Sequence, residues 1–239
     1  MTDDNSKSLD IFGIKPVADS INIVTKASIE GASSFLGKIC LPAAEEFGLL
    51  LRDRVSNWRL RNQIRMLQKA EVKFDRFSKP HAHAHPRLVS SILSASSWTD
   101  NDAVHEMWAG LLTSSCSTEG DDESNLIFVS ILSVLTSLQA RILNHCCEFA
   151  EKKLSRGGWL TSEPYYLKLE ELEKVAGTSD FHRLGRELDH MRSLGLIAHG
   201  FMPDSTLADL APTSLGLQMY VRCQGYTGSP LDYFGISKS

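Results

Sequence analysis

Residues 167–210, LKLEELEKVAGTSDFHRLGRELDHMRSLGLIAHGFMPDSTLADL, carry the pattern that decides the fold of the C-terminal third of the chain. Two apolar stripes recur there at a spacing of three or four residues, which predicts two short helices. The first stripe consists of Leu167, Leu169, Leu172 and Val175. The second consists of Phe181, Leu184, Leu188, Met191 and Leu194. Between them, Gly-Thr-Ser at 177–179 predicts a turn and an N-cap for the second helix.

A candidate hairpin follows the second predicted helix. Gly195 is placed where a residue in the left-handed conformation would end that helix. Leu196 and Ile197 then start a strand, Pro-Asp-Ser at 203–205 turns it, and residues 207–210 return it as a wing. Helix, turn, helix and hairpin in this order predict a winged-helix-like α+β module. Such a module is more often a recognition device than a catalyst.

Composition bounds the class of protein. The chain has 239 residues, of which 42% are hydrophobic, so it is long enough for one large or two small domains with apolar cores. Its formal net charge of −4 argues against a surface built throughout to hold polyanions, and any such site must be local. The sequence therefore predicts a folded, soluble protein.

Cysteine usage and the absence of apolar runs predict a cytoplasmic location. The five cysteines lie at positions 40, 116, 146, 147 and 223, without a C-x-x-C pair or a spacing typical of zinc sites or disulfide frameworks. The first residues are acidic and polar, unlike the positive start of a signal peptide, and no run of about 18 uncharged apolar residues occurs. We expect reduced thiols in a cytoplasmic protein.

An amphipathic stripe runs through residues 11–41 and predicts one helix or a broken pair of helices. Its members alternate at three and four positions: Ile14, Val17, Ile21, Val24, Ser28, Gly31, Phe35 and Ile39. Small residues between 31 and 37 allow close approach of another helix or of a lipid surface. Packing within a bundle or an oligomer is the favoured interpretation, since amphipathicity usually indicates a core face. Membrane contact and disorder are the alternatives.

A basic helix is predicted from Pro42 to about Phe77, because proline is favoured at the first helical position. The segment from Arg52 to Lys79 contains nine basic and three acidic residues, so its formal net charge is +6. Arg61, Arg65, Lys69 and Lys73 sit four apart and form a ridge that can follow phosphates or anionic headgroups. The favoured alternative is a solvated face that pairs with the acidic remainder of the protein.

Residues 78–86 read as a linker, because two prolines bracket three histidines. In an extended segment His81, His83 and His85 point to the same side, which suggests a metal site. No Cys, Asp or Glu joins them within the linker, so a solvent-exposed cluster is the favoured interpretation and a structural metal the alternative.

The segment from Pro86 to about Leu154 has a helical pattern throughout and predicts a compact bundle. Thr99 with Asp102, and Thr136 with Gln139, resemble capping boxes at two helix starts. Residues 126–135 are strongly apolar, which predicts a helix buried on most sides. Gly157 and Gly158 then separate the bundle from the winged-helix-like region.

Catalytic patterns are missing from the sequence. No nucleophile with a base, no paired carboxylates and no glycine-rich phosphate loop occur at a useful spacing. Cys146 and Cys147 lie in an apolar helix and are expected to pack in the core. His105 and Glu106 are neighbours on a helix and point about 100° apart, so we interpret them as surface polar residues beside a core stripe. We predict no enzyme activity, no cofactor, no metal and no small-molecule substrate.

The second helix of the winged-helix-like region has no excess of positive charge. The segment from Gly177 to His199 contains three arginines and three acidic residues, Asp180, Glu187 and Asp189, so its formal net charge is zero. Phosphate binding needs several cations, so protein contact is favoured for this module over nucleic acid and over a purely structural role. The candidate residues for an anion or nucleic acid are Arg54, Arg61, Arg65, Lys69, Lys73, Arg76, Arg183 and Arg186.

Several residue groups together resemble the abortive-infection alpha family, a bacterial group linked to phage defence. The groups, in order, are Leu41-Pro42-Ala43 with Glu46 and Gly48, Met107 to Leu112, Phe128 to Leu135 with Leu138-Gln139-Ala140, Leu194 to Ile197, and Thr213 to Gly216 ending near Cys223. The similarity covers residues 40 to 225, and its order is more specific than any one group. The resemblance implies a defence context and supplies no catalytic motif.

We therefore expect a mainly helical cytoplasmic protein with a helical bundle and a C-terminal winged-helix-like module. The expected segments are an amphipathic helical region (1–41), a long basic helix (42–80), a bundle (81–155), the winged-helix-like domain (156–225) and a flexible tail (226–239). The expected function is non-enzymatic: binding of a protein partner or self-association through the 11–41 stripe, in abortive infection. A nucleic-acid-binding regulator and a membrane-active effector are the alternatives.

Overall fold

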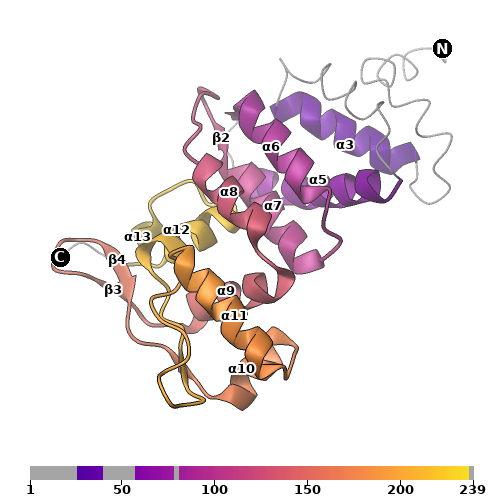
Figure 1. The fold of residues 1–239 in the computed structure, drawn as a ribbon. Helices are drawn as coiled ribbons and strands as arrows, with labels where there is room; N and C mark the ends of the chain where they lie inside the picture. Colours follow the sequence, from indigo (N-terminus) through magenta and orange to yellow (C-terminus); the bar gives the residue numbers. More distant parts are fainter. Residues whose placement is uncertain (1–25, 40–56, 78–80, 237–239) are drawn as a thin grey trace, which may run out of the picture. The chain divides into compact units, whose positions relative to one another are not determined.

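The computed structural model describes residues 26–39, 57–77 and 81–236 (Figure 1). Within these ranges the protein is mainly helical, with three small antiparallel sheets of two strands each. The chain divides into two compact units, residues 1–133 and 134–239, and each is described by itself. The predicted helical class is thereby confirmed.

The first unit is built around helices α5 and α7. Its elements are α3 (Lys26–Ile39), α5 (Asn57–Phe77), β1 (His83–Ala84), α6 (Pro86–Ser96), α7 (Asp102–Ser114) and β2 (Cys116–Ser117), with α8 (Leu126–Val134) at its end. Helix α5 packs along α7 and also contacts α3 and α6. The fully buried side chains at this centre include Met66, Leu88, Ile92, Met107, Trp108 and Leu111. This core fixes the position of the basic helix.

The second unit is built around helix α9. Its elements are α9 (Ser137–Phe149), β3 (Lys152–Leu154), β4 (Leu160–Ser162), β5 (Tyr166–Leu167), α10 (Leu169–Ala176), α11 (Phe181–Ser193), β6 (Ala208–Asp209), α12 (Ser214–Cys223) and α13 (Pro230–Tyr233). Helix α9 contacts α10, α11 and α12. The predicted stripe residues Leu172, Leu184, Leu188 and Met191 are all buried in this unit.

The predicted hairpin after α11 is present. Gly195 has φ +70, and Leu196 N donates to Met191 O at 3.0 Å, which is the pattern of a left-handed helix end. Bridges join Ile197 to Pro212 and Phe201 to Ala208, and the chain turns between them at 203–205. Ala208 also pairs with Leu167 of β5, so β6 lies between β5 and the outgoing strand.

Two predicted helix starts are wrong by one or two residues. The N-cap of α7 is Asn101, whose side chain accepts from Val104 N, while Thr99 Oγ1 accepts from Asn101 N. The N-cap of α11 is Asp180, just after the segment 177–179. Several Ser, Thr, Asn and Asp residues compete for the cap at each site, and any of them can accept the hydrogen bond. The capping box predicted for Thr136 and Gln139 is confirmed.

The segment around the three histidines is not a free linker. Its alanines, Ala82 and Ala84, are buried, and β1 pairs with β2 in the register His83 to Ser117 and Ala84 to Cys116. The predicted alternation is present, because His81 and His83 are exposed while the alanines between and after them are not. His85 is the N-cap of α6 and accepts from Arg87 N. A strand thus replaces the expected loop, because small apolar side chains alternate with the histidines.

Helix α8 is less buried than its composition predicts. Phe128, Val129 and Leu132 face the interior, but Ile127 and Val134 are 60% and 52% exposed. The apolar run that forms α8 does not show from its periodicity which face is buried. Helix α9, in turn, is shorter than predicted, because it ends at Phe149 and Leu154 lies in β3.

The described part of the N-terminal stripe packs inside the first unit. Phe35 and Ile39 are buried, and the ring of Phe35 meets that of Phe74 on α5 edge to face, with centroids 5.8 Å apart. The interpretation as a core face therefore holds for residues 31–39. Ile14 to Val24 lie outside the described residues, as does the predicted beginning of the basic helix at 42–56.

The division into units differs from the predicted segments. Helix α9 belongs to the second unit, because its buried side chains pack on α10, α11 and α12, whereas the sequence assigns it to a bundle at 81–155. The expected tail contains α13, and the rings of Tyr233 at its end and of its C-cap residue Phe234 contact Tyr220. Among the described helices, none combines the length and apolar composition needed to cross a bilayer.

Candidate functional site

The predicted basic ridge lies on α5, and part of it is neutralised by α7. Lys69 Nζ lies 3.0 Å from Asp102 Oδ1 and 2.6 Å from Glu106 Oε1, and Lys73 Nζ lies 3.2 Å from Glu106 Oε2. Burial opposes the charged form of Glu106, but its hydrogen bonds with Lys69 and Lys73 outweigh burial and lower its pKa. Lys69 and Lys73 are therefore structural partners of α7 as well as surface cations.

The other predicted cations of α5 differ in their surroundings. Arg61 is half-buried, Arg65 and Arg76 are exposed, and the Arg76 guanidinium lies 4.9 Å from the Phe77 ring centroid. Arg54 lies outside the described residues. Of the predicted ridge, Arg65 is thus the member that is both exposed and not bound by Asp102 or Glu106 in an ion pair.

Arg59 was not among the predicted site residues. Its Nε donates to Ser97 Oγ at 3.0 Å, and its guanidinium lies 4.1 Å from the ring centroid of Trp98. Trp98 follows α6, so this contact depends on how α5 and α6 pack. Nothing in the local sequence around Arg59 or Trp98 indicates the pairing.

His105 is buried, which corrects its interpretation as a surface residue. It is 1% exposed, and its Nε2 lies 2.8 Å from Thr99 O. A carbonyl oxygen can only accept, so Nε2 carries the proton in this pair. Burial lowers the pKa of His105, although the hydrogen bond to Thr99 opposes this effect. Glu106 remains at the surface, turned toward the lysines of α5.

His105 should give the first unit a dependence of stability on pH. Its folded pKa lies below the ordinary value of 6.5, so below that pH the unfolded chain binds a proton that the folded chain does not. The free energy of unfolding is expected to fall as pH decreases from about 7 to about 5, and to fall less for His105→Gln, which keeps a donor for Thr99. Urea unfolding at each pH measures the effect.

The matched control for this prediction is His145→Gln. His145 is a second histidine whose pKa is lowered by burial, but it lies in the second unit. This variant should retain the share of the pH dependence that belongs to His105. Equal pH profiles for the wild type and His105→Gln would show that His105 is not buried in its neutral form.

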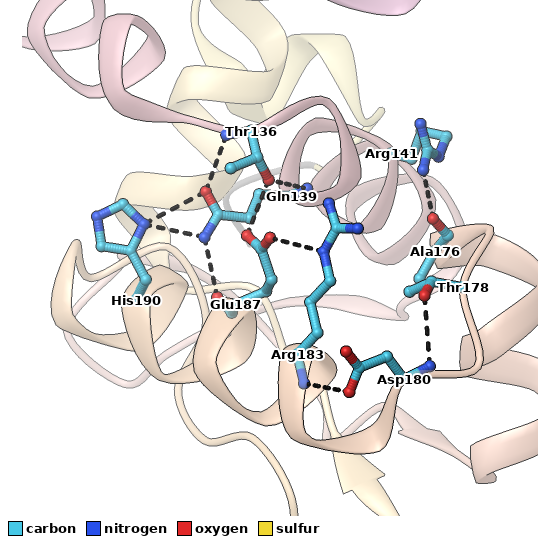
Figure 2. Close-up of polar contacts among 9 residues, drawn as sticks. All are labelled: Thr136, Gln139, Arg141, Ala176, Thr178, Asp180, Arg183, Glu187 and His190. Carbon is cyan, nitrogen blue, oxygen red and sulfur yellow. Dashed lines mark hydrogen bonds and ion pairs between the residues drawn. The ribbon is translucent and has the colours of Figure 1, made fainter.

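The acidic residues of α11 and of its N-cap are all engaged within the second unit, and Figure 2 shows the contacts of Asp180 and Glu187. Asp180 Oδ1 accepts from Arg183 N at 3.0 Å as the N-cap. Glu187, whose side chain is only 12% exposed, accepts from Thr136 Oγ1 at 2.8 Å and lies 3.5 Å from Arg183 Nε. Asp189 pairs with Arg192 at 2.9 Å. The negative charges that make the predicted net charge of this helix zero are therefore held in local contacts.

Gln139 of α9 is the centre of this network. Its Oε1 accepts from Thr136 N at 3.1 Å, and its Nε2 donates to Glu187 O at 3.1 Å. His190 Nδ1 lies 2.9 Å from Gln139 Nε2. Arg141, two residues further along α9, donates to Val175 O at 3.3 Å and to Ala176 O. Helix α9 thus holds both α10 and α11 by side-chain hydrogen bonds (Figure 2).

Gln139→Leu is expected to destabilise the second unit by about 2 kcal/mol, because Thr136 N and Glu187 O would lose a buried partner. Asn144→Leu on the same helix is the matched control. Asn144 Oδ1 is buried and has no hydrogen-bond partner among the described residues, so its removal should cost little. Urea unfolding measures both, and an equal loss for the two variants would contradict the role of Gln139.

The outer face of α11 combines apolar and charged residues. Phe181 is 40% exposed, and its ring centroid lies 4.8 Å from that of Phe201 in the hairpin, next to Met202, which is 38% exposed. The predicted residues Arg183 and Arg186 are both exposed on this helix. Only Arg183 is drawn into the Glu187 network, so the structure brings together Arg183 and Glu187 but leaves Arg186 facing outward.

The metal alternative finds no support in the described part of the chain. No group of three or more His, Cys, Asp and Glu side chains there is arranged to hold an ion. His85 Nδ1 lies 3.7 Å from Glu123 Oε1, and Arg87 lies 3.2 Å from the same oxygen. The carboxylate of Glu123 is therefore shared with an arginine.

Comparison with known proteins identifies a family. The family model named abortive infection alpha matches residues 58–211, which is more than half of the chain. The match runs from the first turn of α5 to the end of the hairpin after α11, so it includes α7 and the α9–α11 network. Neither a curated protein nor a solved structure matches the chain. Because this model matches more than half of the chain, the chain belongs to the abortive infection alpha family.

Proposed function

We propose that this protein contributes to phage defence by abortive infection as a non-enzymatic protein that binds a protein partner or a second copy of itself. Membership in the family supports the defence context. We place the contact surface on the second unit, at α11 and the hairpin that follows it, and the protein in the cytoplasm.

The order of elements in the second unit supports a winged-helix-like module. Helix α9, strand β5, helices α10 and α11, and the hairpin ending in β6 follow one another, and β6 pairs with strand segments on both sides. Two helices joined by a short turn, followed by a hairpin, form a recurrent recognition motif. Arg141 and Gln139 fix α10 and α11 in this module.

The observation that carries the choice of a protein partner is the surface of α11. Arg183 and Arg192 are paired with carboxylates of the same helix, while Phe181 and Met202 are partly exposed beside them. Polyanion binding draws on an excess of cations, whereas aromatic residues and Met are enriched at protein interfaces. The mixed surface of α11 therefore fits a protein better than a phosphate backbone.

Phage plating tests this proposal. Cells that produce the wild-type chain should reduce plaque numbers for a susceptible phage, and Phe181→Ser should abolish the reduction. Trp159→Ser is the matched control, because Trp159 is an exposed aromatic residue of the same unit, on the loop between β3 and β4. Full protection by a folded Phe181→Ser chain would contradict the proposed contact surface on α11.

Two measurements on the purified chain complete the test. Sedimentation over a wide range of concentrations separates self-association from the binding of a different partner. Turnover of a small compound, lost on substitution of a single polar side chain, would contradict a non-enzymatic role. The segment 11–25 lies outside the described residues, so self-association through it is tested by the same sedimentation experiment on a Phe181→Ser background.

A further inference from the structure

Trp98 is held in place and yet open to solvent. The Arg59 guanidinium lies 4.1 Å from its ring centroid, and Arg59 Nε donates to Ser97 Oγ at 3.0 Å. Trp98 is nevertheless 66% exposed. One face of the indole is thus covered by a cation, and most of the remaining surface is free for a ligand.

Two buried amides hold the end of α6 against α5 and so fix Trp98. Asn62 Nδ2 donates to Ser97 O at 3.1 Å, and Gln63 Nε2 donates to Leu93 O at 3.1 Å. Both side chains are less than a tenth exposed. An aromatic platform that is already ordered loses little conformational entropy when a ligand binds.

The helix that supports Trp98 is positively charged. Between Asn57 and Phe77 there are six basic and two acidic residues, a formal balance of +4. Two carboxylates of α7 reach α5: Asp102 pairs with Lys69, and Glu106 pairs with both Lys69 and Lys73. Arg65, one turn before Lys69, is exposed, lies within the electrostatic reach of Asp102, and forms an ion pair with neither of these two carboxylates. Asp100, two residues after Trp98, is an exposed carboxylate close to it in the chain, and Asp102 is a second one that pairs with Lys69.

The geometry points to a binding site for single-stranded nucleic acid, in which an unpaired base stacks on the open face of Trp98 and Arg65 contacts the phosphate backbone. Single-strand binding proteins combine aromatic stacking with a cationic surface in this way. In a duplex each base is already stacked between its neighbours, so its face is not available to Trp98. The site lies in the first unit and goes beyond the protein contact proposed for α11.

Fluorescence polarisation of the full chain with a labelled oligonucleotide of about 20 unpaired nucleotides, at about 50 mM salt, tests the site. Both an oligodeoxyribonucleotide and an oligoribonucleotide are used. Trp98→Ala should weaken binding about tenfold, since stacking contributes that order of affinity per base. Trp159→Ala is the matched control, because Trp159 is 68% exposed but lies in the second unit. It should bind like the wild type.

Charge variants give an independent readout. Arg65→Ala should weaken binding and reduce the slope of log affinity against log salt by about 0.7, the contribution of one phosphate contact in a single strand. Asp100→Asn should strengthen binding, because it removes a negative charge near the platform. Trp98→Phe should restore part of the affinity lost in Trp98→Ala.

The proposal is overturned if neither oligonucleotide binds at this salt concentration. It is also overturned if folded Trp98→Ala, judged by circular dichroism and urea unfolding, binds as tightly as Trp159→Ala, or if a duplex of the same length binds as well as the single strand. The plating test concerns Phe181 in the other unit, so each of the two proposals, the nucleic-acid site and the protein contact, can be contradicted without the other.

Discussion

Gly216→Ala is expected to lower the free energy of unfolding of the second unit by about 3 kcal/mol or more. A Cβ atom at this position would overlap the carbonyl oxygen of Leu196 and lie 3.2 Å from its carbonyl carbon and 3.4 Å from its Cα. These are main-chain atoms, so no side-chain rotation relieves the overlap. Either α12 or the segment after α11 must move.

Both of these segments are held by hydrogen bonds. Leu196 N donates to Met191 O at 3.0 Å, and Thr213 N donates to Leu196 O at 3.0 Å. Thr213 is also the N-cap of α12 and accepts from Gly216 N at 3.1 Å. A shift that makes room for the methyl group would break one of these contacts, and this is why the expected loss lies at the upper end for overpacking.

The matched control is Gly185→Ala in the middle of α11. Apart from the adjoining residues and the backbone of α11 itself, no atom lies within 4 Å of the position of its added Cβ, so alanine fits and should stabilise the helix by about 0.5–1 kcal/mol. Urea unfolding of both variants, followed by circular dichroism, should give opposite shifts of the midpoint. Similar midpoints for Gly216→Ala and the wild type would show that α12 does not approach Leu196 this closely.

The parts of the fold that the sequence predicts are those set by local spacing. The stripes of α10 and α11, the left-handed Gly195 and the turn at 203–205 depend on residues within a few positions of one another. The helix starts at Asn101 and Asp180 were missed by one or two residues, because neighbouring polar side chains compete as caps. The sequence does not predict the exposed side of α8, because nearly all residues of this helix are apolar and their spacing does not distinguish a buried face from an exposed one.

The candidate sites depend on contacts between residues far apart in the chain. The sequence identifies the cations of α5, but only the packing of α5 on α7 shows that Asp102 and Glu106 neutralise Lys69 and Lys73. Similarly, the neutral composition of α11 was evident, whereas the burial of Glu187 against Thr136 was not. The Arg59–Trp98 contact joins two helices and has no local signal.

Trp108→Ala is expected to destabilise the first unit by about 3–5 kcal/mol, because it removes the largest fully buried side chain of α7 and leaves a cavity. Trp108 is 2% exposed, and its neighbours Ala109, Leu111 and Leu112 have no exposed surface. Helix α7 packs along α5, so the loss of packing on α7 should also weaken the support of the helix that carries the cationic face.

Trp98→Ala is the matched control for this prediction, since it deletes the same side chain from the same unit at a position that is 66% exposed. It should cost at most about 1 kcal/mol, mainly through the loss of its contact with Arg59. Urea unfolding separates the two variants by midpoint. Because Trp108 lies within the family match and is buried in the first unit, plating protection should fall with the folded fraction of Trp108→Ala and recover at lower temperature. Equal midpoints for the two variants would mean that α7 is not the central helix of the first unit, and the placement of Arg59, Arg65 and Lys69 on a fixed helix would lose its basis.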